Sequence, residues 1–263
     1  MFDDKVAVVT GGATGIGAAT ATLLAERGAH VVVAGIQPLA TLEAFCAKLR
    51  ELGGKASAVQ CDVADTASVD TLFAQVEETH GRLDVLVNSA GVSFLVELER
   101  MDRADIVKCI NVNLLGPILT TRAALPLMRA SGGGAIVNIA SGASILGVEG
   151  MAVYAATKAG LAQFTRTLAP ELRGSGIRVN CVGPGSTRTE MLGYTSEVLT
   201  ADQEAALARR RENSSSPYGN ALIEPHDIAQ VILFAASDAS RAMQGSFLLA
   251  DDGVTSSIRP PAR

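Results

Sequence analysis

Short apolar runs alternate with longer amphipathic stretches along this chain of 263 residues. Apolar runs begin near residues 6, 31, 56, 83, 135, 177 and 247. The stretches between them, such as 39–52 and 68–80, carry apolar residues at helical spacing. Strands and helices that alternate in this way predict a parallel sheet covered on both faces. Near-continuous runs such as Val31–Ala34 fit strands that are buried on both sides.

No linker or change of composition divides the chain, and its length is ordinary for one α/β domain. We therefore expect a single domain over residues 1–263. The least regular stretch, 186–220, follows the sixth expected strand. It is predicted to form a lid over a site at the carboxyl ends of the strands.

The first apolar run, Lys5–Thr10, leads into the sequence Gly-Gly-Ala-Thr-Gly-Ile-Gly and then into the helical pattern Ala18–Arg27. Glycines let a backbone approach phosphate closely, and a helix N-terminus offers free N–H groups and the positive end of a dipole. A plain turn is the alternative interpretation. The order strand, glycine turn and helix nevertheless favours a diphosphate site, formed by Gly11, Thr14, Gly15, Ile16 and Gly17.

Tyr154 and Lys158 stand four residues apart, so on a helix their side chains share one face. A nearby ammonium group favours the phenolate form and moves the phenol pKa down towards neutral pH. Ser141 follows the run Ala135–Ala140, at the end of an expected strand, where open α/β sheets hold their chemistry. These three residues supply the acid, the cation and the hydroxyl that reduction of a carbonyl group needs.

Together these motifs resemble the short-chain dehydrogenases/reductases, in their single-domain branch. The resemblance rests on Thr10–Gly17, Asn88–Gly91, Asn113, Ser141, Tyr154-x-x-x-Lys158 and Pro184-Gly185, in that order, and it covers nearly the whole chain. It implies an α/β fold with a doubly wound (Rossmann) seven-stranded parallel sheet. It also implies a nicotinamide dinucleotide at the carboxyl ends of the strands and assembly as a homotetramer or homodimer.

The same resemblance implies a role for each catalytic candidate. Tyr154 would be the general acid in reduction and, as phenolate, the base in oxidation. Lys158 would hold the nicotinamide ribose and lower the Tyr154 pKa, and Ser141 would hydrogen-bond the substrate oxygen. Asn113, rather than Asn111, is similar to the residue that positions a water in a proton relay to Lys158; a structural helix Asn is the alternative.

Further residues are expected at the cofactor. Asp62, followed by Val63, resembles an adenine-binding Asp, although it could equally cap a helix or turn. The turn after the fourth strand would line the adenosine side with Asn88, Ala90 and Gly91. Beyond the sixth strand, the residues expected to contact the carboxamide and phosphates of the cofactor are Pro184, Gly185, Thr187 and Thr189.

The choice between NAD and NADP depends on the end of the second strand. An acidic side chain there would bind the ribose diol of NAD, but this chain has Gly35. A phosphate of NADP needs Arg or Lys, and Thr14 and Ile36 occupy the two places where a base is expected. Both cofactors remain open, and NAD is favoured because an unpaired phosphate is harder to accommodate.

The expected pocket walls are mainly apolar and carry no charge, which indicates a neutral, moderately hydrophobic small-molecule substrate. Besides Ser141, they are Phe94, Ala143, Leu146, Met191 and Tyr194.

Composition narrows the remaining possibilities. A net charge of −5 and a pI near 5.3 argue against nucleic-acid binding, and no apolar run is long enough to suggest a membrane partner. The four cysteines stand singly and only three histidines are present, so neither a metal site nor a disulfide framework is indicated. We expect a cytoplasmic protein.

Two alternative functions share these motifs. One is reduction of 3-oxoacyl groups on acyl carrier protein, which would need basic residues for an acidic carrier; Arg129 and Arg173 are the nearest candidates. The other is a non-catalytic dinucleotide sensor, since a fold alone does not establish catalysis. A sensor would have no use for Asn113, Ser141, Tyr154 and Lys158 together.

Overall fold

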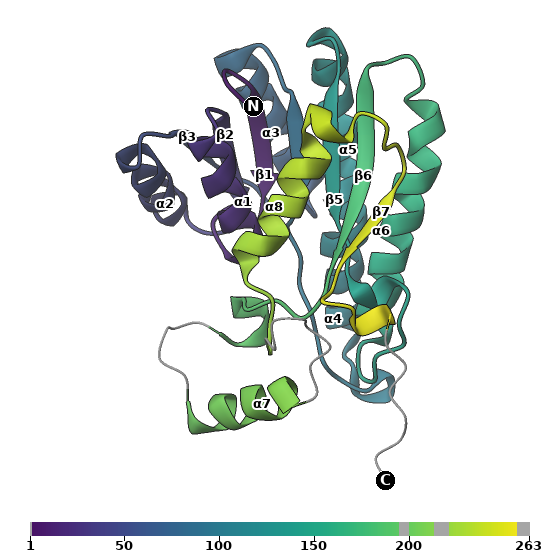
Figure 1. The fold of residues 1–263 in the computed structure, drawn as a ribbon. Helices are drawn as coiled ribbons and strands as arrows, with labels where there is room; N and C mark the ends of the chain where they lie inside the picture. Colours follow the sequence, from purple (N-terminus) through teal and green to yellow (C-terminus); the bar gives the residue numbers. More distant parts are fainter. Residues whose placement is uncertain (1, 195–199, 213–220, 257–263) are drawn as a thin grey trace.

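A computed structural model describes residues 2–194, 200–212 and 221–256 of the chain. Its centre is a parallel seven-stranded sheet in the order β3-β2-β1-β4-β5-β6-β7 (Figure 1). The strands are β1 (Val6–Thr10), β2 (His30–Gly35), β3 (Lys55–Gln60), β4 (Val85–Asn88), β5 (Gly134–Ile139), β6 (Ile177–Pro184) and β7 (Phe247–Ala250). The parallel sheet predicted by the alternating pattern and the doubly wound, seven-stranded fold implied by the resemblance are confirmed.

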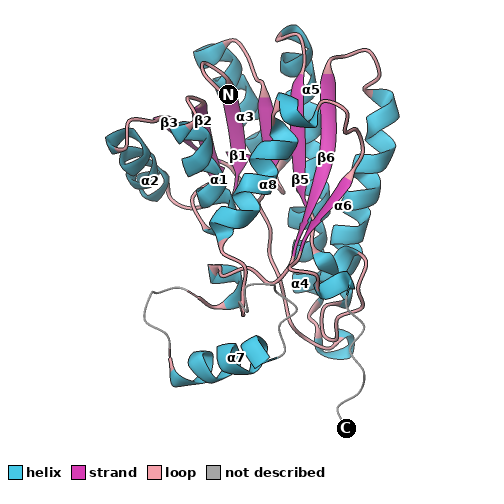
Figure 2. Ribbon diagram, viewed as in Figure 1, coloured by secondary structure: helices cyan, strands magenta, loops and turns pink. Residues whose placement is uncertain are grey.

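Helices cover both faces of the sheet (Figure 2). One face packs against α1 (Gly15–Glu26), α2 (Leu39–Glu51) and α8 (Pro225–Ala236). The other packs against α3 (Thr66–His80), α5 (Gly116–Ala130) and α6 (Ala152–Glu171). The short α4 (Arg103–Ile110) runs through a π-helical turn, 111–115, into α5. The two apolar cores lie between these helices and the sheet.

Strand and helix limits follow local chemistry. Helix α3 begins two residues before the expected start at 68, because Asp65 caps it by accepting a 3.1 Å hydrogen bond from the backbone N–H of Ser68. Strand β4 begins at Val85 rather than near Leu83, whose N–H instead donates to the hydroxyl of Ser131. These differences leave the order of elements unchanged.

A buried polar network joins the middle strands to the helices behind them. The Asn88 side chain donates to the Oδ1 of Asn138 at 2.8 Å and accepts from the Thr120 hydroxyl at 2.7 Å. Asn138 in turn donates to the hydroxyl of Thr165 at 2.9 Å. Each side chain is at most 2% exposed, and buried polar groups satisfied in this way fix one arrangement of their elements. The network therefore sets β4 and β5 in place against α5 and α6.

A second anchor lies at the amino ends of the strands. The Asp84 carboxylate is 5% exposed and accepts two hydrogen bonds from Arg82, at 2.9 and 2.7 Å. It also accepts from the Lys5 ammonium at 3.2 Å and from the Val6 N–H at 2.9 Å. Burial raises the pKa of Asp84, but these donors outweigh it and hold the pKa below its usual value.

The region expected to form a lid contains η4 (Glu190–Leu192) and α7 (Ala201–Glu212). Figure 1 shows α7 apart from the sheet, on the side where the strands end. Residues 195–199 and 213–220 of the expected lid lie outside the described residues. Closure over a site therefore stays a prediction. Across the described helices, none is both long and apolar enough to cross a membrane.

Candidate active site at the carboxyl ends of the strands

The glycine turn between β1 and α1 is closely packed. Any Cβ on Gly17 would collide with the carbonyl oxygen of Gly11, and a Cβ on Gly11 would lie 2.9 Å from the Cα of Ala90. The Gly12 N–H donates to the Ala34 carbonyl at 3.2 Å, which fixes the turn against the end of β2. Thr14, the N-cap of α1, makes no side-chain cap hydrogen bond. An uncapped helix start behind a glycine turn suits the diphosphate of a dinucleotide.

Helix α6 brings Tyr154 and Lys158 to the end of β5. The Lys158 ammonium group donates a 2.8 Å hydrogen bond to the carbonyl oxygen of Ile139 and lies 5.7 Å from the centre of the Tyr154 ring. Ser141, two residues beyond Ile139, lies close enough to the Tyr154 phenol to affect its pKa. The structure therefore brings together the three residues that the sequence analysis grouped.

Burial has the largest effect on the pKa values of Tyr154 and Lys158. Burial raises the pKa of Tyr154, and the nearby Ser141 hydroxyl opposes that rise without cancelling it. Burial also lowers the pKa of Lys158 to about 8. The expected lowering of the Tyr154 pKa by Lys158, helped by the positive charge of the oxidised nicotinamide ring, stays a prediction.

Asn113 lies in the π-helical turn and is fully buried. Its Oδ1 accepts from the Val92 N–H and its Nδ2 donates to the Val92 carbonyl, both at 2.8 Å. Its Nδ2 also lies 3.4 Å from the Thr157 hydroxyl, which donates to the Tyr154 carbonyl at 2.7 Å. Asn113 therefore ties the loop after β4 to the helix that carries Tyr154.

Gly91 marks the point where these groups converge. A Cβ at this position would lie 3.4 Å from Asn113 Oδ1, 3.6 Å from Lys158 Nζ and 3.6 Å from Met191 Cε. The four residues come from the loop after β4, the π-helical turn, α6 and η4, so their meeting is a property of the fold. Met191, 45% exposed, covers this point from the lid side.

The loop after β4 is held by Thr10 at the end of β1. The Thr10 hydroxyl accepts from the N–H groups of Ser89 and Ala90, at 3.1 and 3.2 Å. This places Ala90 beside Gly11 of the glycine turn, and contact of Ala90 and Gly91 with adenosine stays a prediction. The Asn88 side chain differs, because it points into the buried polar network and not into a cofactor site.

Asp62 follows β3 and forms a turn rather than a helix cap. One carboxylate oxygen accepts from the Ala64 N–H at 2.9 Å, while Asp65 caps α3. The neighbouring Val63 is buried, and a Cβ on Gly116 would lie 2.8 Å from its Cγ2. Asp62 keeps a second carboxylate oxygen for a ligand, so the turn and adenine roles are compatible.

The segment after β6 returns over the glycine turn. A Cβ on Gly185, which follows Pro184, would lie 2.8 Å from the Cα of Asp251. Thr187 is buried, and its hydroxyl donates to the Gly185 carbonyl at 3.0 Å. A Cβ on Gly15 would lie 3.0 Å from Thr189 Cγ2 and 3.4 Å from a carboxylate oxygen of Glu190. Thr189 is expected here from the sequence, whereas Glu190 is not, since nothing in its spacing singles it out.

Most residues expected to line the substrate pocket lie on two loops that a backbone hydrogen bond joins. The Val96 N–H donates to the Gly150 carbonyl at 2.9 Å, which joins the loop containing Phe94 to the loop containing Ala143 and Leu146. Large apolar side chains on these loops are exposed: Leu95 77%, Leu98 60%, Ile145 57% and Val148 41%. Tyr194 lies farther along the lid, and its N–H donates to the Thr189 carbonyl at 3.2 Å. The loops thus present an apolar rim.

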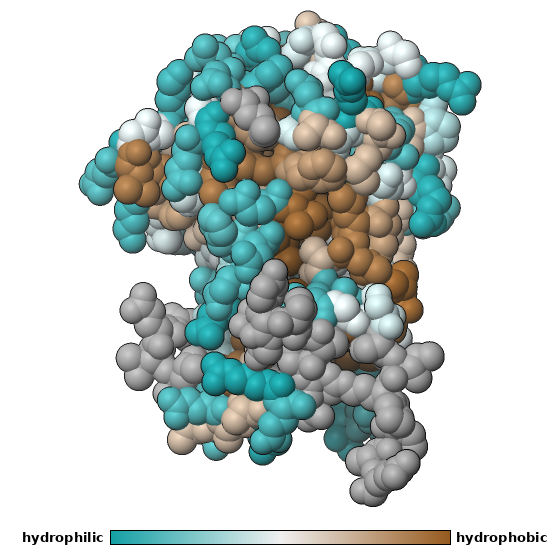
Figure 3. Space-filling model, in the orientation of Figure 1, coloured by the Kyte–Doolittle hydropathy of each residue, from teal (hydrophilic) through white to brown (hydrophobic). Residues whose placement is uncertain are grey.

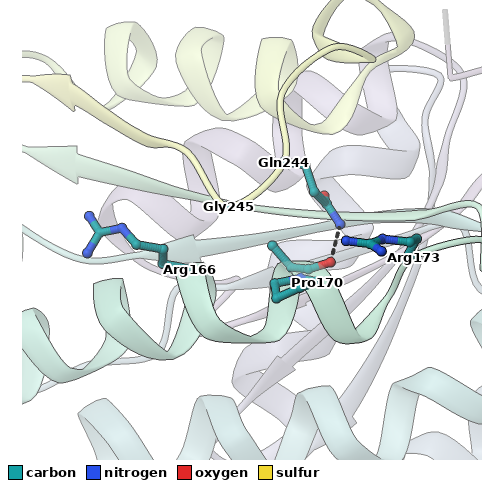
Figure 4. A pocket seen from close by; sticks show the side chains of 6 residues that line it. Arg166, Pro170, Arg173, Gln244 and Gly245 are labelled. Carbon is teal, nitrogen blue, oxygen red and sulfur yellow. Dashed lines mark hydrogen bonds between the residues drawn. The ribbon is translucent and has the colours of Figure 1, made fainter.

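A separate hollow of about 360 Å³ lies against the C-terminal half of α6 (Figure 4). Arg166, Pro170 and Arg173 line it from the helix, and Gln244 donates to the Ala169 carbonyl at 3.1 Å from the other side. Sixteen residues of helix separate Tyr154 from Pro170, or about 24 Å at 1.5 Å per residue. This hollow is therefore distinct from the candidate active site.

Comparison with known proteins defines the class. A family model described as short chain dehydrogenase matches residues 5–199. The chain belongs to this family.

The relatives include a cis-4-hydroxycyclohexanecarboxylate dehydrogenase of Sinomonas cyclohexanicum, which is 41% identical, with 97% of this chain and 98% of that protein covered. They also include a 3-oxoacyl-acyl-carrier-protein reductase of Thermotoga maritima, 38% identical, with 96% of this chain and 98% of that protein covered. The crystal structure of a short-chain type dehydrogenase/reductase from Mycobacterium marinum superposes with a TM-score of 0.86 at 30% identity, with 97% of this chain and 96% of that chain covered. The protein is an NAD(P)-dependent oxidoreductase that transfers a hydride between a nicotinamide dinucleotide and an alcohol or ketone.

Proposed function

We propose that Tyr154, Lys158, Ser141 and Asn113 carry the reaction at the point marked by Gly91. The convergence of Asn113, Lys158 and Met191 on that point is the observation that supports this assignment. A nicotinamide dinucleotide bound along the glycine turn supplies or accepts the hydride. The Tyr154 phenol donates a proton to the substrate oxygen in reduction and removes it in oxidation. Ser141 hydrogen-bonds the same oxygen as charge develops on it.

Lys158 and Asn113 would assist this proton transfer indirectly. Lys158 would hold the nicotinamide ribose hydroxyls, and in leaving Ile139 its ammonium group would favour the phenolate of Tyr154. Asn113, fixed by Val92, would hold a water between Lys158 and solvent.

For the cofactor we propose NAD. The glycine cradle at Gly11, Gly15 and Gly17 supports a dinucleotide, with Asp62, Ala90 and Thr187 around it. No arginine or lysine occupies the positions beside the expected adenosine ribose, where Thr14 and Ile36 stand. A 2′-phosphate would lack a counter-charge there.

For the substrate we propose a neutral, moderately hydrophobic secondary alcohol or ketone, with the reacting carbon on a ring or short chain. The exposed apolar rim of Leu95, Ile145 and Val148 supports a moderately hydrophobic substrate. The name of the Sinomonas relative supports a secondary alcohol on a ring, although the compound in that name also carries a carboxylate. The test is kcat/KM for cyclic and linear secondary alcohols against sugar phosphates and dicarboxylates. A sugar phosphate or dicarboxylate as best substrate would contradict the proposal, and no hydride transfer with any of them would favour the sensor.

A 3-oxoacyl group on acyl carrier protein is the second candidate. It is supported by the Thermotoga relative and by the exposed Arg129 and Arg173, which could contact an acidic carrier. The same acyl chain should be compared free and carrier-linked. A carrier-linked kcat/KM at least a hundredfold higher, reduced when both arginines are changed to Ala, would establish this alternative in place of the first.

We also propose a homo-oligomer, either a tetramer or a dimer. Figure 3 shows a hydrophobic area beside α8, over the β7 edge of the sheet. Phe234 of α8 and Leu249 of β7 are 42% and 40% exposed, and an apolar sheet edge is a suitable surface for a second copy. Light scattering after size-exclusion chromatography gives the mass in solution, and a monomer would contradict the proposal.

A cytoplasmic location is the last part of the proposal. Cys46, Cys61, Cys109 and Cys181 are all buried free thiols. Burial raises the pKa of Cys46 to about 11 and of Cys181 to about 12, so neither is a reactive thiolate. Unpaired, unreactive cysteines fit a reducing compartment. Fractionation of the source cells is the corresponding test.

A further inference from the structure

Gln37 follows the end of β2 and has no role in the reaction proposed for the candidate active site. Gln37 folds back towards Gly35, so that a Cβ on Gly35 would collide with the Gln37 Oε1 atom. The amide thus fills the space in which a side chain at position 35 would begin. Gly35 itself is buried, against Leu42 on its other side.

The Gln37 Oε1 atom is buried and has no hydrogen-bond partner among the described residues. A buried amide oxygen without a donor is unfavourable, so a ligand that supplies an O–H or N–H group there gains the bond that the protein lacks. Gln37 as a whole is only partly buried, so its amide can turn to present Oε1 to a ligand on this side of β2. The site is therefore suited to a hydrogen-bond donor.

This position adjoins the glycine turn. Gly12 donates to the carbonyl of Ala34, one residue before Gly35, and a Cβ on Gly12 would lie 3.2 Å from the Cγ1 of Val33. In a sheet of this kind the adenosine ribose binds at the end of the second strand, where an acidic side chain accepts from its hydroxyls. Here the acceptor is the neutral amide oxygen of Gln37, two residues beyond Gly35.

We infer that Gln37 is the residue that selects the cofactor, by accepting a hydrogen bond from the adenosine ribose diol of NAD. This inference rests on the proposed function and names the specificity determinant of its cofactor site. A ribose hydroxyl donates to Oε1, whereas a 2′-phosphate brings acceptor oxygens and negative charge. Ile36, 67% exposed, is the neighbouring side chain and offers that phosphate no counter-charge.

A neutral amide discriminates less strongly than a carboxylate would. It gains one hydrogen bond with the diol but does not repel a phosphate by charge. We therefore expect NADH to bind about tenfold more tightly than NADPH, the range of one net hydrogen bond. A glutamate in the same place adds charge repulsion and sharpens the preference.

The experiment titrates the wild-type protein, Gln37→Ala and Gln37→Glu with NADH and with NADPH, and follows the fluorescence of the bound reduced nicotinamide. For Gln37→Ala we expect about fivefold weaker NADH binding, little change for NADPH, and loss of most of the preference. For Gln37→Glu we expect NADPH to weaken at least tenfold further. Gln230→Ala, an exposed glutamine of α8, is the matched control and leaves both dissociation constants unchanged.

Thermal unfolding without cofactor separates selection from a structural role. Because Oε1 has no partner to lose, Gln37→Ala should unfold at the wild-type temperature or above it. The inference is overturned if the wild-type protein prefers NADPH, if Gln37→Ala keeps the NADH:NADPH ratio within twofold, or if it unfolds early with the ratio unchanged. If neither dinucleotide binds the wild-type protein, the proposed function itself fails.

Discussion

The Lys158 ammonium group is held by the carbonyl oxygen of Ile139, 2.8 Å away, in a pocket that leaves the lysine 4% exposed. Burial there lowers the pKa of Lys158 to about 8 from the ordinary 10.5. One hydrogen bond to a carbonyl does not compensate for loss of water around a full charge. The residue proposed to assist catalysis therefore costs the protein stability.

Replacing this charge should stabilise the fold and remove activity. We expect Lys158→Met to raise the free energy of unfolding at pH 7 by 1 to 3 kcal/mol, with about 3 kcal/mol as the upper bound set by the pKa change. Urea unfolding measures this, and turnover should fall at least a hundredfold. The exposed Lys48→Met is the control and should change stability by less than about 0.5 kcal/mol.

The same lysine predicts a pH dependence. Between about pH 8 and 10.5 the unfolded chain binds more protons at Lys158 than the folded protein does, so this residue makes stability rise with pH over that window. Lys158→Met should lack this rise. An equal slope in both proteins would show that the lysine is not desolvated in solution.

Tyr154→Phe tests the proton donor. The variant keeps the ring and loses the hydroxyl that meets Ser141, so we expect turnover to fall at least a thousandfold while the dissociation constant for the dinucleotide stays within a few-fold. Steady-state kinetics and cofactor titration give the two quantities. Near-normal turnover by this variant would remove Tyr154 from its proposed role.

Gly91→Ala tests the convergence point. The added methyl group would sit in ordinary contact with Asn113, Lys158 and Met191, at 3.4 to 3.6 Å. We expect normal folding, with kcat/KM reduced at least tenfold because the methyl group takes space from the reacting groups. Gly147→Ala adds the same group in open space and should keep its activity. Equal activity in the two variants would place the reaction elsewhere.

Asp84→Asn tests the anchor at the opposite end of the sheet. Arg82 and Lys5 would lose the buried carboxylate with which they pair. We therefore expect the free energy of unfolding at pH 7 to fall by about 2 kcal/mol. Because the Asp84 pKa is lowered in the folded protein, its contribution is present above the unfolded value near 3.8 and is lost as pH falls through the folded value. The exposed pair of Asp4 and Lys55 is the control, and Asp4→Asn should cost little.

The sequence was informative where local pattern decides structure. Apolar runs located the strands because buried parallel strands are apolar on both faces, and the four-residue spacing put Tyr154 and Lys158 on one helix face. The sequence did not show that Lys158 donates a hydrogen bond to Ile139 or that Asn113 is hydrogen-bonded to Val92, because those partners are distant in the chain. The Gln37 side chain was missed for a different reason: its fold-back towards Gly35 depends on a rotamer, which spacing does not specify.

The Asp84 anchor has a consequence for how this protein can change. The Asp84 carbonyl accepts from Ala135 N–H at the start of β5, and six residues of extended chain, about 20 Å, separate Ala135 from Ser141. Substitutions at such distances act additively on stability. A stronger anchor would thus raise the free energy of unfolding. The added stability would allow substitutions at the rim that change substrate preference without unfolding the chain.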